Sequence, residues 1–415
     1  MSQTLDVTAR GGRSSSAETR GAWETVRWLL KPVASLKLTV ALFALCFVIV
    51  FCGTLAQRDH GIQIVVRDYF RSAFVWIPFR HLVFFSVPGS FPFPGGWLLG
   101  ALLLINLLAA HLTRFRFTVQ RIGILLMHAG VLLLLLGELV TGLFQVESRM
   151  DILEGSSAIY VYQPGTVELA IVRPGSGGQD ETVVVPGGLL KVGERIGHAD
   201  LPFDVVVDEY LPNSRLVGRG IGNSQPLTHP QWAAAVPEKL PLVTGTDPNQ
   251  QIDVPSATVT LKKKGTEETI ATEVVSVWLD RIMPPIARTV TVDGKAYEIA
   301  LRFRRNYKPF TIHLEDFQHE KYLKTNIPKD FRSEVRLEDP SRGENRRLAI
   351  WMNHPLRHAG ETFYQADFRP DNMGTVLQVV RNPGWLIPYI ACGLAAMGML
   401  VHFGFILSRF LNRIL

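Results

Sequence analysis

The sequence is poor in cysteine, with only three in 415 residues. Cys46, Cys52 and Cys392 all lie within long apolar runs, and no Cys-x-x-Cys pair occurs. A thiol–disulfide oxidoreductase needs two closely spaced, accessible thiols, so that class of protein is excluded. The long polar stretch from 145 to 381 contains no cysteine and therefore no disulfide, whichever compartment it faces.

Several other signatures are missing. The sequence contains no phosphate-binding loop, no nucleophile elbow and no pair of carboxylates in a usable context. The first apolar run lacks a small-residue cleavage site, so we expect no cleaved secretory signal. The sequence does not support an enzyme that acts alone.

What the sequence does have is four long apolar runs. About 20 helical residues, at about 1.5 Å each, cross a hydrocarbon layer of about 30 Å. The sequence therefore predicts a membrane α+β protein with four transmembrane helices and a large β-rich extracytoplasmic domain between the third and the fourth. The four runs are Leu36–Leu55, Trp97–Leu112, Ile122–Phe144 and Trp385–Leu407.

Basic residues predict the orientation of these runs. The terminal segments and the link between the second and third runs hold eleven basic residues and three acidic ones, whereas 145–381 holds 28 basic and 31 acidic residues. Because Lys and Arg gather on the cytoplasmic side, both termini should face the cytoplasm across the inner (plasma) membrane. The predicted parts are a tail (1–34), three helices with loops (35–144), the β-rich domain (145–384), the fourth helix (385–408) and a cytoplasmic end (409–415).

The middle of the chain shows short alternating runs separated by turn residues, which favour an antiparallel sandwich or an open barrel. The clearest hairpin joins Thr289–Val292 to Lys295–Phe303 through Asp293-Gly294, a pair typical of a type I′ turn. The stretch from Pro212 to Ser256 reads as an irregular surface loop. Other predicted strands are 167–172, 182–185, 203–207, 257–261, 273–278, 311–317, 333–337, 348–352, 361–368 and 375–380.

Residues 351–365, Trp-Met-Asn-His-Pro-Leu-Arg-His-Ala-Gly-Glu-Thr-Phe-Tyr-Gln, resemble the ResB family of cytochrome c biogenesis proteins. The run from Val376 to Trp385 is similar to that family's approach to its last span, and the four apolar runs are similar to its spans. The resemblance implies system II haem delivery. A Trp-rich ResC or CcsA partner would act with this chain to present haem to apocytochrome c. The eight Trp residues here are scattered, so the partner's Trp-rich motif is absent.

Haem iron takes axial nitrogen or sulfur ligands, and eleven histidines are candidates. An ionisable residue inside a span is a functional candidate because burying it is costly. His128 lies in the third run, where the resemblance implies a haem ligand, so we expect it to bind b-type haem iron. A hydrogen bond to Asn106 or to a backbone carbonyl is the alternative. His402 has a similar depth and could pair with His128, while His111 lies at a helix end.

Three other features leave structural readings open. His354 is a candidate haem contact, and its i, i+4 spacing to His358 would suit a metal only on a helix, which Pro355 opposes. Glu138 could bind a proton or propionate, or be neutral. Lys262-Lys263-Lys264 reads as a solvated turn rather than a contact for an acidic partner. The Phe363-Tyr364-Gln365 triplet reads as a core strand rather than as a ligand contact.

Two functions follow. The first is a membrane subunit of cytochrome c maturation that holds or relays haem. The second is a haem-free scaffold that docks another envelope or respiratory complex through the 212–256 loop. Nothing in the basic charge indicates nucleic acid, because it is concentrated at the ends of the apolar runs.

Overall fold

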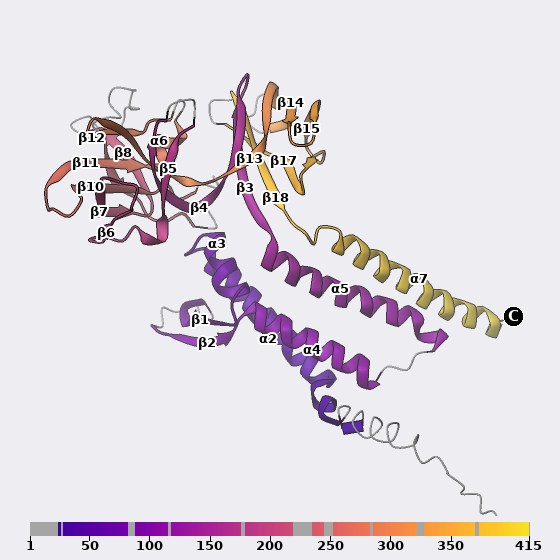
Figure 1. Ribbon diagram of the computed structural model, residues 1–415. Coiled ribbons are helices and arrows are strands. Elements are labelled where there is room, and N and C mark those ends of the chain that lie inside the picture. The colour runs from indigo at the N-terminus through magenta and orange to yellow at the C-terminus, as the bar shows by residue number, and fades with distance from the viewer. Residues whose placement is uncertain are drawn as a thin grey trace, which may run out of the picture. The chain divides into compact units, whose positions relative to one another are not determined.

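The computed structural model describes residues 24–25, 28–81, 88–114, 118–175, 179–218, 235–244, 252–282, 285–321, 328–369 and 373–414. The chain divides into two compact units, shown in Figure 1. The helical unit comprises Met1–Phe144 and Pro383–Leu415, and the β-rich unit comprises Gln145–Asn382.

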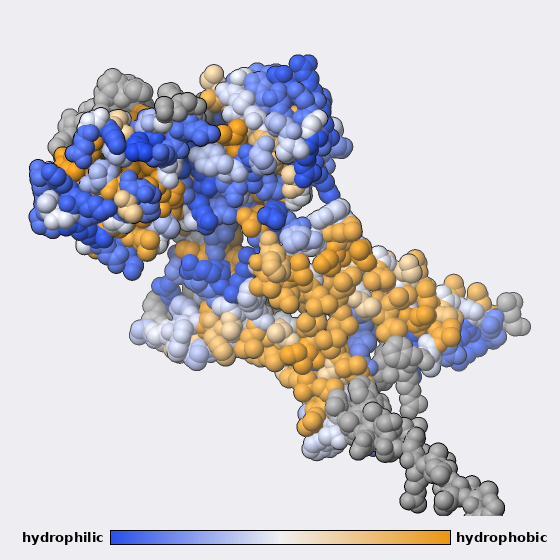
Figure 2. Space-filling view, in the orientation of Figure 1, coloured by the Kyte–Doolittle hydropathy of each residue, from blue (hydrophilic) through white to orange (hydrophobic). Residues whose placement is uncertain are grey.

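Within the described residues, four helices are long and apolar enough to cross a membrane. They are α2 (Leu36–Ala56), α4 (Gly96–Arg114), α5 (Ile122–Phe144) and α7 (Ile387–Ile414). Their surfaces are dominated by apolar side chains (Figure 2). The predicted runs are confirmed, but α7 does not end near Leu407 and continues to Ile414. The charged end of α7 stays helical, because a helix is held by backbone hydrogen bonds and does not need apolar side chains.

A buried amide fastens the start of α2 to α4. Asn106 is 2% exposed, and its Nδ2 donates to the carbonyl oxygen of Val33 at 2.6 Å. Its Oδ1 accepts a hydrogen bond from Thr39 Oγ1 at 2.7 Å. In a span such bonds satisfy polar groups that lipid cannot. Asn106 is therefore used to join helices.

Small residues allow α5 and α7 to pack closely. Gly123, Gly130 and Gly137 are all buried and recur every seven residues on α5. A Cβ placed on Gly130 would lie 2.7 Å from the carbonyl oxygen of Ala391 on α7. Such a Cβ on Gly123 would lie 2.6 Å from the backbone nitrogen of His402. The two helices meet backbone to backbone, as small-residue stripes allow in membranes.

The segment between α2 and α4 contains structure that the sequence did not predict. A short helix α3 (Ile62–Val65), a π-turn η1 (Val66–Phe70) and a hairpin of β1 (Phe74–Pro78) and β2 (Ser90–Pro94) occupy it. One face of the hairpin joins an apolar cluster with residues of α2 and the first turn of α4. Among the described residues, 3-10 turns form at η2 (Phe79–His81), η3 (Val119–Arg121) and η4 (Gly187–Leu189).

All strand pairs in the β-rich unit are antiparallel. A ten-stranded sheet has the order β15-β14-β13-β4-β3-β18-β17-β16, with β12 on β13 and β5 on β4, and a four-stranded sheet has the order β11-β10-β7-β6. The strands are β3 (Val146–Leu153), β4 (Ser157–Arg173), β5 (Glu181–Pro186), β6 (Arg195–Ile196), β7 (Phe203–Leu211), β8 (Ser214–Gly218), β9 (Ala235–Lys239), β10 (Ser256–Lys263), β11 (Thr269–Ser276), β12 (Arg288–Val292), β13 (Lys295–Lys321), β14 (Pro328–Asp339), β15 (Glu344–Trp351), β16 (Leu356–His358), β17 (Glu361–Phe368) and β18 (Gly374–Arg381), with helix α6 (Val277–Arg281).

Two apolar cores lie along the long strands β4 and β13. The first core takes side chains from the four-stranded sheet, such as Val205 and Leu261, and from the large sheet, such as Leu169 and Ile299. It is a sandwich of two sheets. The second core contains side chains of the large sheet, among them Met150, Ile312 and Phe363.

The second core requires the large sheet to curl. Strands β14 and β17 are separated by four strands in the sheet order, yet Ser333 Oγ on β14 donates to Gln365 Oε1 on β17 at 2.7 Å. Gln365 Nε2 in turn donates to Thr375 Oγ1 at 2.9 Å. This half of the unit is therefore an open barrel, and the unit combines both predicted alternatives. The Phe-Tyr-Gln triplet is a strand whose Phe363 is fully buried and whose Gln365 closes the barrel.

Most predicted strands fall within observed ones, and two predictions need correction. The hairpin is confirmed, with Asp293 at φ 50° and Gly294 at φ 74°. The segment at 273–278 leaves the strand at Ser276, because Ser276 caps α6 by accepting a hydrogen bond from Trp278 N. The insert from Pro212 is not simply an irregular surface loop, since β8 and β9 pair and Asn213 is buried. Residues 219–234 and 245–251 of the insert lie outside the described residues.

Candidate functional site

Two histidines of the helical unit lie together. His111 on α4 and His128 on α5 have ring centroids 4.8 Å apart and planes at 73°. Nδ1 of His128 lies 2.9 Å from the carbonyl oxygen of Ile124, and Nδ1 of His111 lies 2.8 Å from that of Leu107. A carbonyl only accepts, so Nδ1 of each ring must carry the proton. In the neutral ring, Nε2 then holds the lone pair.

That tautomer is the one a metal needs. A ligating imidazole commonly donates its other N–H to a carbonyl, which fixes the ring and leaves one nitrogen for the metal. Within the described part of the helical unit, Nε2 of His128 forms no hydrogen bond. The predicted alternative, a bond to a backbone carbonyl, is present, but it occupies only Nδ1. Asn106 has other partners.

The contact between the rings limits what they can do jointly. Two axial imidazoles lie on opposite faces of a porphyrin. Rings in direct contact leave no space for a porphyrin between them. In this arrangement the two rings cannot bind one haem iron from opposite faces.

His402 does not share this contact. Its backbone lies against Gly123, five residues before His128 on α5, which is about 7.5 Å along a helix. Its ring lies beside Phe403 of its own helix, with centroids 5.7 Å apart. Glu138 has an exposed side chain on α5. The structure thus brings His128 together with His111, and the pairing with His402 stays a prediction.

His358 and His354, two histidines of the β-rich unit, have structural partners. His358 is buried, and its Nε2 lies 2.8 Å from Asp339 Oδ2. His354 is exposed and stacks on Trp351 with ring centroids 4.2 Å apart. His354 follows a tight turn at Asn353, with φ 60°, whereas His358 is the last residue of strand β16 after Pro355, so the two imidazoles do not share a helical face. The assignment of His354 as a haem contact stays a prediction.

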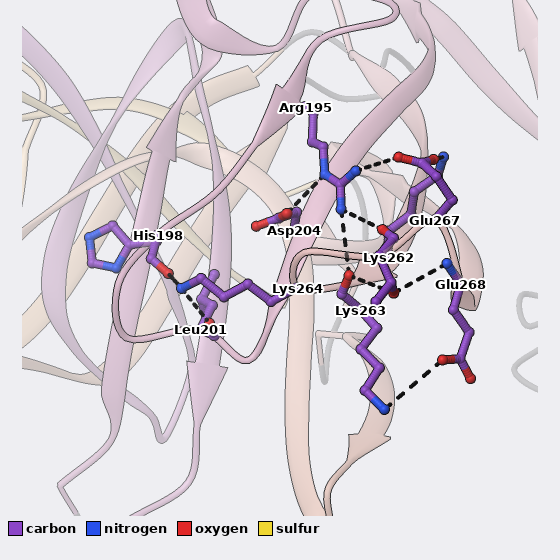
Figure 3. A network of polar contacts seen from close by, with 10 residues as sticks. Arg195, His198, Leu201, Asp204, Lys262, Lys263, Lys264, Glu267 and Glu268 are labelled. Carbon is purple, nitrogen blue, oxygen red and sulfur yellow. Dashed lines mark hydrogen bonds and ion pairs between the residues drawn. The ribbon is translucent and has the colours of Figure 1, made fainter.

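Each lysine of the run has an ion-pair or hydrogen-bond partner. Lys262 and Lys263 form ion pairs with Glu267 and Glu268, respectively (Figure 3). Lys264 Nζ donates to the carbonyl oxygen of His198 at 2.8 Å. Arg195 also contacts Glu267, at 2.7 Å. The predicted solvated turn is therefore also a closed network, which makes it a poor site for an acidic partner.

A second buried polar group lies between the two cores. Tyr162 Oη donates to Asp151 Oδ1 at 2.8 Å, and Arg369 is 4.0 Å from the other carboxylate oxygen. Burial raises the pKa of Asp151, although the hydrogen bond from Tyr162 opposes the shift. Burial also raises the pKa of Tyr162. The group is a structural pair, because Tyr162 is buried and most of the Asp151 side chain is covered by protein.

Comparison with known proteins identifies a family that part of this chain resembles. The ResB-like family model matches residues 286–376. Residues 286–376 form a ResB-like region. Protein NrfI of Wolinella succinogenes is 31% identical over 112 residues, which are 27% of this chain and 12% of that protein. The chain thus matches a small part of this relative. The ResB-like region contains the barrel-closing residues Ser333 and Gln365, and it confirms the resemblance drawn from residues 351–365.

The sequence did not predict the contact between the rings of His111 and His128. The sequence places His111 only at the end of a helix. The available signal was its place in a helical hairpin, since His111 and His128 flank the same link between α4 and α5. Residues that flank a short link meet across antiparallel helices.

Proposed function

We propose that this chain is a membrane subunit of cytochrome c maturation that holds haem through His128. The ResB-like region supports a role in cytochrome c maturation, and the four apolar helices support a membrane location. The positive-inside distribution supports cytoplasmic termini and an extracytoplasmic β-rich unit.

The observation that carries the haem assignment is the hydrogen bond from His128 Nδ1 to Ile124 O at 2.9 Å. This hydrogen bond orients the ring and keeps a lone pair on Nε2, so Nε2 is suited to bind a haem iron. Haem is the cargo here, and its iron and vinyl groups supply the chemistry of attachment. His128 contributes one axial nitrogen, and the surrounding apolar side chains of α4 and α5 exclude water.

We further infer that a Trp-rich membrane protein of the ResC/CcsA type completes the site and that apocytochrome c receives the haem. The contact of His111 with His128 supports this division of labour. Since the two rings do not leave space for haem between them, a second axial ligand from another chain suits the geometry better than one from His111.

The test is the haem content of the detergent-purified full chain, wild type and His128→Ala, with His402→Ala as the matched variant on another span. We expect a Soret band in the wild type and its loss in His128→Ala. A band kept in His402→Ala would favour a second ligand from the partner, whereas its loss there would favour the predicted pairing of His128 with His402. A colourless wild type, purified together with its partner protein, would favour the haem-free scaffold instead.

A further inference from the structure

The β1–β2 hairpin presents an uncharged outer face. Phe74 and Trp76 on β1 are 68% and 66% exposed, whereas Val75 and Ile77 between them are buried. In the register, Trp76 faces Pro92 and Phe74 faces Pro94. The hairpin therefore contributes two aromatic rings, three prolines and Ser90 to this face, and none of these residues is charged. Arg67 and Asp68 lie beside Phe74 and Trp76. A surface of this kind on water is unusual unless something covers it.

The inner face fixes where the hairpin sits within the helical unit. Val75 and Ile77 belong to the same apolar cluster as Cys52 and Ala56 in the last turns of α2 and Leu99 in the first turns of α4. The N–H of Gly95, between β2 and α4, donates to Ala73 O at 2.8 Å. The hairpin is thus held beside the ends of two apolar helices, at the level where a span meets the membrane surface.

Strand addition by a partner does not fit the edge of β2. Proline has no N–H, so Pro92 and Pro94 cannot donate toward β1 or toward another strand. In an antiparallel ribbon, residues at alternate positions direct their N–H groups outward. Phe91 and Phe93 occupy the positions of β2 whose N–H groups face β1, and the two prolines occupy the alternate positions, which face outward. The outward positions at 92 and 94 therefore lack the donors that an added strand would need.

We propose that the β1–β2 hairpin is a membrane-interface anchor, with Phe74 and Trp76 inserted at the headgroup level of the lipid bilayer. Trp is enriched at that level because its ring is apolar and its N–H is polar. The continuity of the hairpin with α2 and α4 selects lipid as the occupant. The anchor sets the depth of these two helices in the membrane, independently of haem.

The experiment uses the full chain in lipid nanodiscs and measures tryptophan fluorescence. The Trp76 component is obtained by subtracting the spectrum of Trp76→Phe from that of the wild type. Nanodiscs are prepared with phosphatidylcholine brominated either near the headgroup end or near the methyl end of its acyl chains. We expect the Trp76 component to lose most of its intensity with the shallow bromines and less with the deep ones.

Phe74→Trp provides a second reporter on the same face, so the test does not depend on one variant. It should add fluorescence with the same preference for shallow bromines. Trp278→Phe is the control, because Trp278 lies in the β-rich unit and its Nε1 donates to Ser214 O. Its component should be insensitive to both lipids. An unquenched Trp76 overturns the proposal. Red-shifted emission would then indicate water, and blue-shifted emission a covering protein.

Discussion

In the β-rich unit, Glu168 and Arg302 are both buried and lie 2.9 Å apart, and His358 contacts Asp339 at 2.8 Å. In the helical unit, Nδ1 of His128 donates to a carbonyl of its own helix, and Nε2 has no hydrogen bond to the described residues. Burying a polar group without a partner is costly. The difference therefore separates these two buried pairs, which hold the fold together, from a ring that keeps one nitrogen for a ligand.

The two units also differ in how their elements pack. In the open barrel, strands near the two edges of the curled sheet are joined by side-chain hydrogen bonds, such as that between Ser333 and Gln365. The α5–α7 pair instead relies on the absence of side chains, at Gly123, Gly130 and Gly137. Water competes for hydrogen bonds in one environment and lipid offers none in the other, so each unit uses the contacts that its solvent allows.

Arg302→Leu tests the buried ion pair of the β-rich unit and has the largest expected effect. It leaves the Glu168 carboxylate buried without its partner, and we expect a loss of about 3–5 kcal/mol in the free energy of unfolding. Denaturant unfolding of the full chain would measure it. The double variant Glu168→Leu/Arg302→Leu should recover much of the loss. Lys263→Ala is the surface control, and an equal loss there would contradict the assignment.

Gly130→Leu tests the packing of α5 on α7. Its side chain would enter space occupied by Ala391 O, and overpacking costs about 1–3 kcal/mol, or more where backbones touch. We expect a lower thermal midpoint in detergent and faster proteolysis. Gly393→Leu on α7 is the matched control, because a Cβ there meets nothing within 4 Å. Similar effects of both changes would show that the glycine stripe is not a contact.

Gln365→Ala tests the closure of the barrel. Ser333 and Thr375 are both fully buried and would lose their partner, which costs about 1–3 kcal/mol. Tyr364→Ala, on the exposed side of the same strand, should cost less. Thermal unfolding followed by circular dichroism distinguishes them. If Tyr364→Ala were the more damaging change, the barrel closure would not depend on Gln365.

The smallest effect concerns Asp151 and pH. Burial raises its pKa above the ordinary 3.8, so the folded chain keeps the proton at pH values where the unfolded chain has lost it. The contribution of Asp151 to stability therefore falls as pH rises from 3.8 through the raised pKa. Relative to wild type, Asp151→Asn should gain stability across that window and level off above it. A difference that does not vary with pH would refute the shift.

Local patterns predicted much of this molecule. The bounds of α5 follow from its unbroken apolar run, and the β12–β13 hairpin follows from Asp293-Gly294, because only residues that tolerate positive φ suit such a turn. The β1–β2 hairpin was missed because prolines in β2 argue against a strand. Such a strand is tolerated here at a sheet edge.

Contacts between distant segments could not be derived in this way. The meeting of His111 with His128 depends on how α4 approaches α5, and no periodicity in either helix encodes that approach. The role of Gln365 in closing the barrel depends on the curl of a sheet of ten strands. In both cases the residue type was visible in the sequence, but its partner was set by the tertiary fold.

The most direct test of iron ligation by His128 is chemical rescue. His128→Ala, purified as the full chain and supplied with haem and then titrated with free imidazole, should regain the wild-type Soret maximum as imidazole fills the vacated position. Wild type should not respond to imidazole at the same concentrations. An unchanged Soret band in His128→Ala before any imidazole is added would contradict the account.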